Sequence, residues 1–548
     1  MPAGPISGLI PGQMMDRPLL VAPLLRFAGD YHGDTTVVTR SVEGPIHRTT
    51  YGETHRRVQK LANALKALGI KPGDRVATLA WNTWRHLELY YAVAGIGAVC
   101  HTVNPRLPVD HMRMVLTHAA DRIVFYDTTF TDLVAGLKDS VPCVERFIPL
   151  CDAVHAPTDP RLGQVLTYED LIAPHAEAYD WPEFNENTAA SLCYTSGTTG
   201  TPKGVLYSHR ALVLHSYSMV ASSRMTVDDV MLPVVPMFHV NAWGVPYAAP
   251  MVGAAQVFAG RAMDGQSLFE LMDGEAVTCA LGVPTLWMGL LTHMRAVGRK
   301  PRALERVVIG GAAASESMID TFELEFGVEV NHAWGMTETT PLGVVNTLKP
   351  KFKALSRPDQ TKLKSKQGRA IFGVDLRIVD DEEKVLRHDG VAAGRLQVRG
   401  PWIIQSYFQH DGQALTPDGW IDTGDIATID GDGYMHITDR AKDVIKSGGE
   451  WISSVDLENA ALGHPDVAMA AVIGIHHPRW TERPLLICVP KGAARPTLAE
   501  INDYLSRKVP KWWLPEAIAF VESLPIGPTG KIQKTKLREQ FKDYRFDA

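Results

Sequence analysis

The sequence lacks the surplus of positive charge that broad binding to nucleic acid requires. Its 548 residues contain 55 Lys and Arg against 61 Asp and Glu, which gives a formal net charge of −6. Affinity for nucleic acid depends on the neutralisation of phosphates by an excess of cations. We therefore expect no nucleic-acid partner, while a local basic site for a phosphorylated ligand stays compatible with the composition.

Cysteine is also scarce. The chain has 6 cysteines, and none of them belongs to a CxxC pair or to a Cys/His cluster with zinc-ligand spacing. So few thiols in so long a chain are typical of a reducing compartment. The sequence has neither the pattern of a signal peptide nor a stretch of about 18 uninterrupted apolar residues. We expect a cytoplasmic enzyme without a transmembrane segment.

The apolar pattern predicts an α/β fold. Strand-like runs at 75–80 and 122–127 alternate with helical periodicity at 52–68 and 86–99. This rhythm is typical of parallel sheets covered by helices. From about residue 365 the strands shorten and Gly/Asp turns separate them, which predicts a small antiparallel, barrel-like region. The last ~100 residues have the size and pattern of a compact α+β domain.

The segment SLCYTSGTTGTPKGVLYSH (191–209) predicts a loop that holds phosphate. Its glycines allow backbone N–H groups to point inward, and its hydroxyls and lysine ammonium add donors for phosphate oxygens. A Walker A loop requires GxxxxGK[ST] before a helix, whereas glycine and the strand-like residues 205–207 follow Lys203 here. The sequence therefore predicts a phosphate loop between two strands. Its candidate residues are Thr195, Ser196, Gly197, Thr198, Thr199, Gly200 and Lys203.

A run of small residues from Gly310 to Ser315 follows the apolar residues 307–309. Small side chains let a flat ring or an acyl chain approach the backbone, and they also suit a closely packed strand-to-helix turn. Both interpretations can hold, because α/β sheets bind ligands in such crevices. Trp334 then offers a face for adenine. The run lacks GxGxxG, which disfavours a Rossmann dinucleotide site.

Four segments resemble, in order, the motifs of the adenylate-forming superfamily of acyl-CoA synthetases, peptide-synthetase adenylation domains and luciferases. Segment 191–209 is similar to the signature, and WGMTETT (334–340) to the aromatic-Gly-x-Thr-Glu motif. Segment 419–453 resembles the ribose, hinge and CoA-tunnel block, and PIGPTGKIQKTKL (525–537) the C-terminal lysine motif. PMFHVNAWG (236–244) is similar to medium- and long-chain fatty-acyl-CoA synthetases and to the related ligase for 3-methylmercaptopropionate.

The resemblance implies a two-step reaction. A carboxylate and MgATP give acyl-AMP and pyrophosphate, and the CoA thiol then gives acyl-CoA and AMP. It also implies an N-terminal domain with the acyl and ATP sites at 1–439, a hinge at 440–443 with Lys442 as the rotating residue, and a small mobile C-terminal domain at 444–548. We expect a small-molecule carboxylic acid, ATP and CoA as substrates, Mg²⁺ as cofactor, and a homodimer.

The same resemblance assigns roles to individual residues. Lys531 is expected to reach the carboxylate and the α-phosphate. Glu338 and Thr195 are expected to hold Mg²⁺, which prefers hard oxygen ligands, and Asp425 and Arg440 are expected at the ribose. The expected catalytic residues are Lys531, Glu338, Thr195 and Lys203. The other expected nucleotide- and CoA-binding residues are Gly311, Ala312, Ala313, Trp334, Gly335, Met336, Thr337, Ile437, Lys446, Gly448, Gly449, Glu450 and Trp451.

The acyl pocket is expected to contain His239, Trp243, Gly310, Gly311 and Met336. His239 and Trp243 are four residues apart, and they would share a face if that segment is helical. The resemblance places His239 beside the acyl carboxylate and makes Trp243 the gate of a fatty-acid tunnel, although core packing would also explain Trp243.

Several functions stay open on this scaffold. The expected substrate is a medium- or long-chain fatty acid, and 3-methylmercaptopropionate is the main alternative. An acyl-AMP ligase that loads another thiol acceptor, a luciferase-like oxygenase and a non-catalytic nucleotide sensor are further alternatives. The presence of Lys203, Glu338, Asp425 and Lys531 argues against the sensor. Fold alone does not fix the acid, because substrate choice depends on pocket shape.

Overall fold

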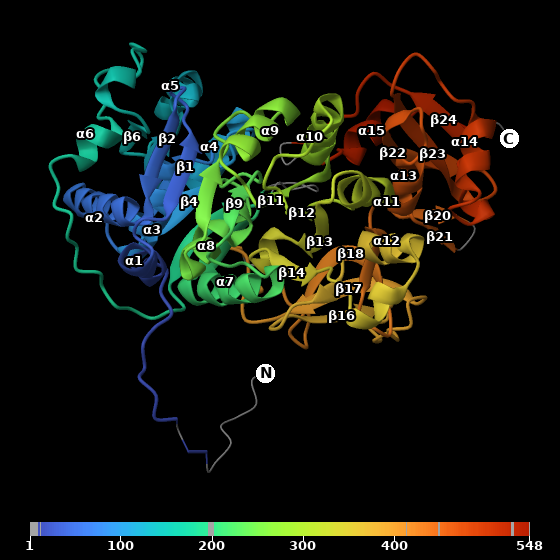
Figure 1. Ribbon diagram of the computed structural model, residues 1–548, viewed down its shortest axis with the longest axis horizontal. Coiled ribbons are helices and arrows are strands. Elements are labelled where there is room, and N and C mark those ends of the chain that lie inside the picture. The colour runs from blue at the N-terminus through green and yellow to red at the C-terminus, as the bar shows by residue number, and fades with distance from the viewer. Residues whose placement is uncertain are drawn as a thin grey trace.

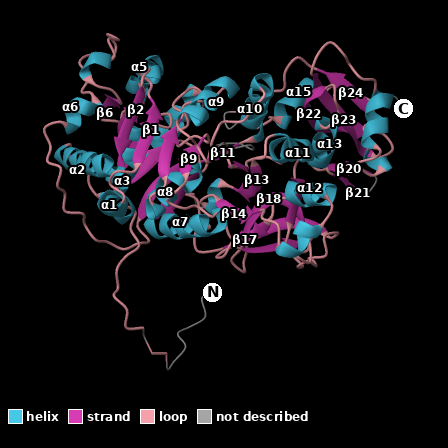
Figure 2. Ribbon diagram, viewed as in Figure 1, coloured by secondary structure: helices cyan, strands magenta, loops and turns pink. Residues whose placement is uncertain are grey.

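The computed structural model describes residues 9–10, 12–195, 202–410, 412, 414–447, 450–527 and 531–546. Its strands form two large sheets, a small antiparallel sheet and a C-terminal sheet, and helices surround the large sheets (Figures 1 and 2). The C-terminal elements gather at one end of the molecule, beside the small antiparallel sheet (Figure 1). Within the part of the chain that is described, no helix is both long and apolar enough to cross a membrane.

The first large sheet carries the expected phosphate loop. Its strand order is β6-β5-β3-β4-β7-β8, and the neighbours are parallel except for the antiparallel pair β7–β8. The strands are β3 Arg75–Leu79, β4 Val99–Thr102, β5 Asp121–Tyr126, β6 Arg146–Pro149, β7 Ala189–Tyr194 and β8 Gly204–Ser208. The helices of this part of the chain are α2 Tyr51–Ala67, α3 Trp84–Gly95, α4 Val109–Ala119, α5 Thr131–Leu137 and α6 Tyr168–Ile172. The segment 195–203 thus connects two paired strands, as the sequence predicts.

The second large sheet is parallel in its centre and antiparallel at both edges. Its strand order is β15-β14-β13-β12-β11-β9-β10-β1-β2. The strands are β1 Thr36–Arg40, β2 Ile46–Thr50, β9 Val230–Pro233, β10 Ala255–Phe258, β11 Cys279–Gly282, β12 Arg306–Ile309, β13 Glu329–Gly335, β14 Leu342–Val345 and β15 Arg369–Ala370. The associated helices are α1 Ala22–Tyr31, α7 His209–Ser223, α8 Val245–Val252, α9 Gly265–Gly274, α10 Pro284–Val297, α11 Glu316–Asp320 and α12 Arg357–Ser365.

The shorter strands after residue 365 are antiparallel, as expected. They form an open path in the order β16-β17-β18-β19, with bounds β16 Asp375–Val379, β17 Ala393–Arg399, β18 Ile421–Ile429 and β19 Met435–Arg440. The C-terminal domain places helices on a sheet of its own. Its elements are β20 Ile445–Ser447, β21 Glu450–Ile452, α13 Ser454–Leu462, β22 Val467–His477, β23 Thr481–Pro490, α14 Leu498–Leu505, β24 Ala517–Phe520 and α15 Lys534–Gln540.

The helix expected over 86–99 begins earlier and ends sooner. Thr83 accepts the backbone N–H of His86 and so caps α3 at its start. Gly97, two residues beyond the end of the helix, has φ of +81°, a left-handed conformation that is typical of helix ends. Residues 99–102 then form the buried strand β4.

Candidate active site

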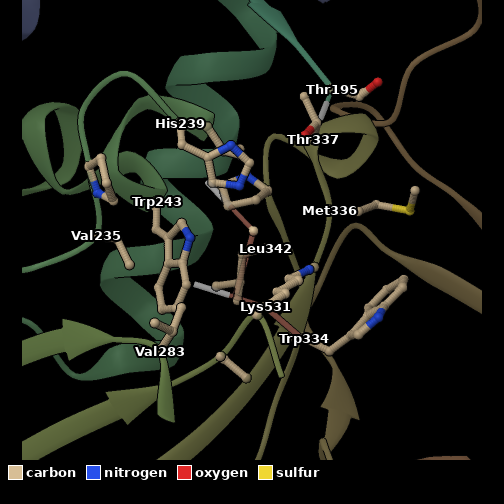
Figure 3. Close-up of a pocket in the computed structure, with 18 of the residues that line it drawn as sticks. Thr195, Val235, His239, Trp243, Val283, Trp334, Met336, Thr337, Leu342 and Lys531 are labelled. Carbon is tan, nitrogen blue, oxygen red and sulfur yellow. The ribbon is translucent and has the colours of Figure 1, made fainter. Parts of the chain in front are cut away.

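A cavity of about 860 Å³ brings the motifs together at the carboxyl ends of the parallel strands of the second sheet. Thr195 and Lys203 flank the segment expected to bind phosphate, Glu338 follows β13, and Arg440 ends β19. Lys531 enters from the C-terminal domain and lies between the side chains of Trp243 and Trp334 (Figure 3). Ligand sites at the carboxyl ends of parallel strands are the rule in α/β sheets.

Lys531 lines this cavity. Its Cε is 3.8 Å from the position that a Cβ at Gly311 would occupy. Water reaches the side chain through the cavity, but the surrounding protein removes much of its hydration. This desolvation and the charge of Arg440 lower the pKa of Lys531 to about 8, while Asp425 and Glu338 act in the opposite direction. The ammonium is therefore available to a nucleotide anion at neutral pH.

Asp425 is more completely engaged than its expected role at the ribose suggests. The side chain is buried; Oδ1 lies 2.7 Å from Nε of Arg440, and Oδ2 accepts the indole N–H of Trp334 at 3.0 Å. Burial raises the pKa of Asp425, and Arg440 opposes that shift. Asp425 thus fixes the orientation of the Trp334 ring, which lines the cavity.

Glu338 lies in the short turn Thr337–Thr339 after β13, and it is buried. Its Oε1 accepts the hydroxyl of Tyr407 at 2.8 Å. The same tyrosine ring lies 4.8 Å from Nζ of Lys203, so one aromatic side chain links the expected metal ligand to the phosphate loop. Sequence reasoning missed Tyr407, because no local motif marks it.

Arg106 is a second cavity residue that sequence reasoning missed. It lies in the loop after β4, and its guanidinium is 5.7 Å from the ring centroid of Trp81 and 5.8 Å from that of Phe238. Burial lowers its pKa. An arginine in a loop carries no sequence signal of this placement, since one of the two rings, Phe238, lies more than 100 residues away in the chain.

The segment after His239 is not a right-handed helix, so the argument from helical spacing was wrong. Val240, Asn241, Ala242 and Trp243 have φ values of 47°, 50°, 49° and 55°. This left-handed turn is costly for non-glycine residues. It nevertheless brings His239 and Trp243 to the same cavity (Figure 3).

Trp243 lies against Gly310. A Cβ at Gly310 would come within 2.9 Å of the Trp243 ring, which explains why a glycine occupies this position. Desolvation and the charge of Lys531 lower the pKa of His239 to about 4. The imidazole is therefore neutral at physiological pH and can share a hydrogen bond with a carboxylate.

Alternate residues of the strands line the cavity behind Trp243. Alternation places i and i+2 on the same face of a strand. The lining residues on these strands are Met231 on β9, Cys279 and Leu281 on β11, Val308 and Gly310 at β12, and Asn331, Ala333 and Gly335 on β13. The wall therefore continues along the sheet from the carboxyl ends of the strands toward their amino ends.

A second cavity of about 1060 Å³ lies between the two domains and shares Gly311, Trp334, Gly335, Arg440 and Lys531 with the first. The residues expected around adenine and ribose line it. They are Ala312, Ala313, Asp425 and Ile437. Met336 and Thr337 line the first cavity instead.

Comparison with known proteins agrees with this geometry. The family model for AMP-binding enzymes matches residues 25–408, and the model for the C-terminal domain of AMP-binding enzymes matches residues 456–531. The chain belongs to the AMP-binding enzyme family.

Several curated relatives of this AMP-binding enzyme are CoA ligases. The 3-methylmercaptopropionyl-CoA ligase of Ruegeria lacuscaerulensis is 50% identical over 97% of this chain and 99% of that protein. A medium-chain fatty-acid CoA ligase of Ectopseudomonas oleovorans is 48% identical over 97% and 98% of the two chains. The anthranilate CoA ligase AuaEII, solved with anthranoyl-AMP, shares the fold with a TM-score of 0.86 at 24% identity, covering 96% and 98%. The chain is thus an ATP-dependent, adenylate-forming acyl-CoA ligase.

Some expected residues lie away from both cavities of this AMP-binding enzyme. Lys446 on β20 and Trp451 on β21 line neither cavity, as far as the described residues go; the backbone N–H of Lys446 donates to Glu482. Ser196, Gly197, Thr198, Thr199, Gly200, Gly448 and Gly449 lie outside the described residues, and so does the side chain of Glu450.

Proposed function

We propose that this acyl-CoA ligase activates a medium- or long-chain fatty acid. The observation that carries the proposal is the mostly apolar wall behind Trp243. Val283, Leu281 and Cys279 line it at every second position, so the wall extends over four residue steps. At about 3.3 Å per residue these four steps span roughly 13 Å. An alkyl chain of medium length fits such a depth, and each buried methylene adds about 0.8 kcal/mol.

The site residues support adenylation of a carboxylate. Two anions meet at the α-phosphorus, so the reaction needs cations and hydrogen-bond donors that stabilise developing charge. Lys531 bridges the carboxylate and the α-phosphate in this proposal, His239 orients the carboxylate, and Lys203 binds the phosphates. Asp425 and Arg440 bind the ribose, where their ion pair is already formed.

The donor set near the phosphate loop suits Mg²⁺. Glu338 and Thr195 line the same cavity, and carboxylate and hydroxyl oxygens are the hard ligands that this ion prefers. Bound there, Mg²⁺ would neutralise charge on the phosphates. Tyr407 holds one carboxylate oxygen of Glu338 and so fixes the side chain that would bind the ion.

A short thioether acid is the alternative substrate. It is favoured by the 50% identity to a 3-methylmercaptopropionyl-CoA ligase, and a thioether sulfur is compatible with an apolar slot. Such an acid would end near Trp243 and leave the wall beyond it unused. Pyrophosphate release measured over straight-chain acids from C2 to C18, with 3-methylmercaptopropionate and benzoate, separates these proposals. A maximum at acetate or benzoate would refute both.

We further propose CoA as the acceptor, bound beside the β20–β21 hairpin after rotation at Lys442. Lys446 is exposed on this hairpin, and Ser447 pairs with Thr481 at the start of β23. The exposed Trp480 stands next to that pair. A cation and an aromatic face suit the phosphates and adenine of CoA. Formation of a CoA thioester from preformed acyl-AMP tests the acceptor, and equal transfer to a carrier-protein thiol would contradict it.

A homodimer and a reducing, cytoplasmic location complete the proposal. The N-terminal segment extends away from the body of the protein (Figure 1) and exposes Leu9, Ile10, Met14 and Met15 by 74%, 90%, 87% and 90%. Such apolar exposure suits contact with a second copy. All six cysteines are free thiols, which suits a reducing compartment. Light scattering of the full chain and of a variant without residues 1–16 tests the dimer.

A further inference from the structure

The last strand of the N-terminal domain is fastened to the first helix of the C-terminal domain. Asp439 on β19 is buried, and its Oδ2 accepts the backbone N–H of Ser454 at 2.7 Å. Its Oδ1 accepts the backbone N–H of Arg440 at 2.7 Å. Ser453, the residue before α13, donates its hydroxyl to the carbonyl of Thr438. These contacts join the residues on either side of the proposed hinge at 440–443.

The same helix start is tied to the segment that carries Lys531. Lys534, the first residue of α15, places its Nζ 2.8 Å from Oε1 of Glu458 and 2.5 Å from Oγ of Ser454. Asp439 attracts this buried ammonium from the other domain. Lys534 therefore connects Asp439, through the start of α13, to a chain segment only three residues beyond Lys531.

Two outer ion pairs surround this buried group. His436 on β19 has Nε2 3.3 Å from Oδ1 of Asp456 on α13, a contact that is charged only when His436 is protonated. Arg538 on α15 lies 2.7 Å from Asp443 at the hinge. These pairs are partly exposed and contribute little individually, so the buried group has the larger effect.

We propose that Asp439, Ser454 and Lys534 form a latch that holds the C-terminal domain in the orientation in which Lys531 enters the cavity. A rotation at Lys442 carries Ser454 away from Asp439, because the two residues lie on opposite sides of the hinge. The latch must therefore break before the CoA step. Asp439 and Lys534 also line the second cavity. Their polar contacts are with protein groups, among them Ser454 and Glu458, so we assign them a positioning role, in which they act through the segment that carries Lys531. The inference rests on the proposed two-step function.

The physical case for the latch is the charge at the helix start. A carboxylate near the first N–H groups of a helix is favourable, because those groups lack partners within the helix. Asp439 supplies that carboxylate from the other domain and also attracts the mostly buried Lys534 electrostatically. A hydrogen bond to a charged group is stronger than a neutral one. Orientation is an equilibrium between two states, and a contact made in only one of them shifts the populations.

The test is Asp439→Ala, measured in the two half-reactions separately. Acyl-AMP formation, followed as pyrophosphate release in a single turnover without CoA, should fall by about 10- to 100-fold, the scale of one charge-assisted hydrogen bond. Thioester formation from preformed acyl-AMP should stay equal or become faster. Asp439→Asn retains an oxygen for the Ser454 N–H but loses the charge, so its adenylation rate should lie between those of Asp439→Ala and the native enzyme.

Glu500→Ala is the matched control. Glu500 accepts the backbone N–H of Thr497 at 2.7 Å at the start of α14, so it also caps a helix but within one domain. Both half-reactions should keep their rates in this variant. Spin labels on α10 and α14 should report a larger share of long distances for Asp439→Ala than for the native enzyme.

Equal loss in both half-reactions, or unchanged adenylation with an unchanged distance distribution, would overturn the latch. The proposed function fails differently. If the native enzyme releases pyrophosphate but forms no CoA thioester, the two-step function is wrong, whereas a native enzyme that prefers another acid leaves the latch testable with that acid.

Discussion

The wall behind Trp243, here called the acyl wall, and the contacts between the two domains, here called the domain junction, are built from different kinds of interaction. The acyl wall consists of alternate residues on parallel strands, whose spacing is fixed by the sheet. The junction consists of hydrogen bonds and ion pairs between β19, α13 and α15, which the proposed rotation of the C-terminal domain would break. Apolar packing in a sheet resists change of shape, while polar contacts across the proposed hinge are compatible with two orientations.

This difference separates substrate choice from the selection of the reaction step. Changes in the acyl wall should alter which acid reacts, with a similar effect on both half-reactions. Changes in Lys531 or at the hinge should alter one half-reaction and leave the preference among acids as it was. The following predictions test that separation, and they begin with the largest expected effect.

Lys531→Ala should reduce acyl-AMP formation by about 10² to 10⁴, the scale of losing one charge partner of a transition state. Thioester formation from preformed acyl-AMP should be affected much less, because in the proposed function the lysine acts only in the orientation used for adenylation. Single-turnover assays of each half-reaction measure both effects. The relative rates across acids of different length should not change. Equal losses in the two half-reactions would contradict the role.

Lys442→Pro should spare adenylation and depress CoA transfer by about 10- to 100-fold. Proline fixes φ near −65° and so restricts the rotation that we propose for the second step. The measurement is the same pair of half-reaction assays, with Lys442→Ala as the control that removes the side chain but keeps backbone freedom. Native rates of the proline variant in both half-reactions would show that Lys442 is not the hinge residue.

Local sequence signals predicted the parts of the structure that depend on local physics. Strand-like apolar runs that alternate with helical periodicity predicted the parallel sheets. The Gly/Thr-rich segment before Lys203, with strand-like residues after it, predicted a connection between two strands, which are β7 and β8. The motif residues Glu338, Arg440 and Lys531 line one cavity. Their roles stay predictions until the variants are measured.

The remaining features depend on contacts between distant segments. Tyr407 reaches Glu338 across 69 positions of the chain, and Asp439 meets Ser454 only after the two domains have docked. The left-handed turn at 240–243 opposes the ordinary preference of its residues, so no propensity would indicate it. Each of these features is a consequence of tertiary packing, and periodicity does not encode it.

Trp243→Ala should broaden acceptance toward long chains and weaken discrimination among short ones. Each methylene buried is worth about 0.8 kcal/mol, or roughly fourfold in kcat/KM, and the gain with chain length should continue further once the ring is removed. The measurement is kcat/KM for acids from C4 to C18 in the native and variant enzymes. An unchanged chain-length profile would show that Trp243 only packs the core.

Gly310→Ala should act in the opposite direction. The added Cβ would meet the Trp243 ring at 2.9 Å and the carbonyl of Ala333 at 3.1 Å, so the ring must shift into the acyl path. Overpacking of this kind costs about 1–3 kcal/mol, and most of the loss should fall on long acids. Gly136→Ala is a suitable control, because Gly136 lies on α5 with open space for the added Cβ. Gly298→Ala is unsuitable, since the φ of +71° at Gly298 would strain an alanine. Equal losses for short and long acids would contradict the steric explanation.

The smallest expected effect is a pH dependence of adenylation. The protein around Lys531 removes part of its hydration, and this desolvation and the charge of Arg440 lower its pKa to about 8. The ammonium therefore predominates below pH 8 and is lost as pH rises. At pH 8, kcat/KM for ATP should be about half its plateau, and it should continue to fall above that value. ATP carries negative charge and therefore raises the pKa of a lysine beside it. The fall of kcat, which reports the enzyme with ATP bound, should occur at higher pH than the fall of kcat/KM. The arginine of Lys531→Arg keeps its charge to about pH 12. This variant should therefore show no fall in activity near pH 8, although its rate is lower. If the arginine variant still loses activity near pH 8, another group titrates there, and the pH dependence of adenylation does not arise from Lys531.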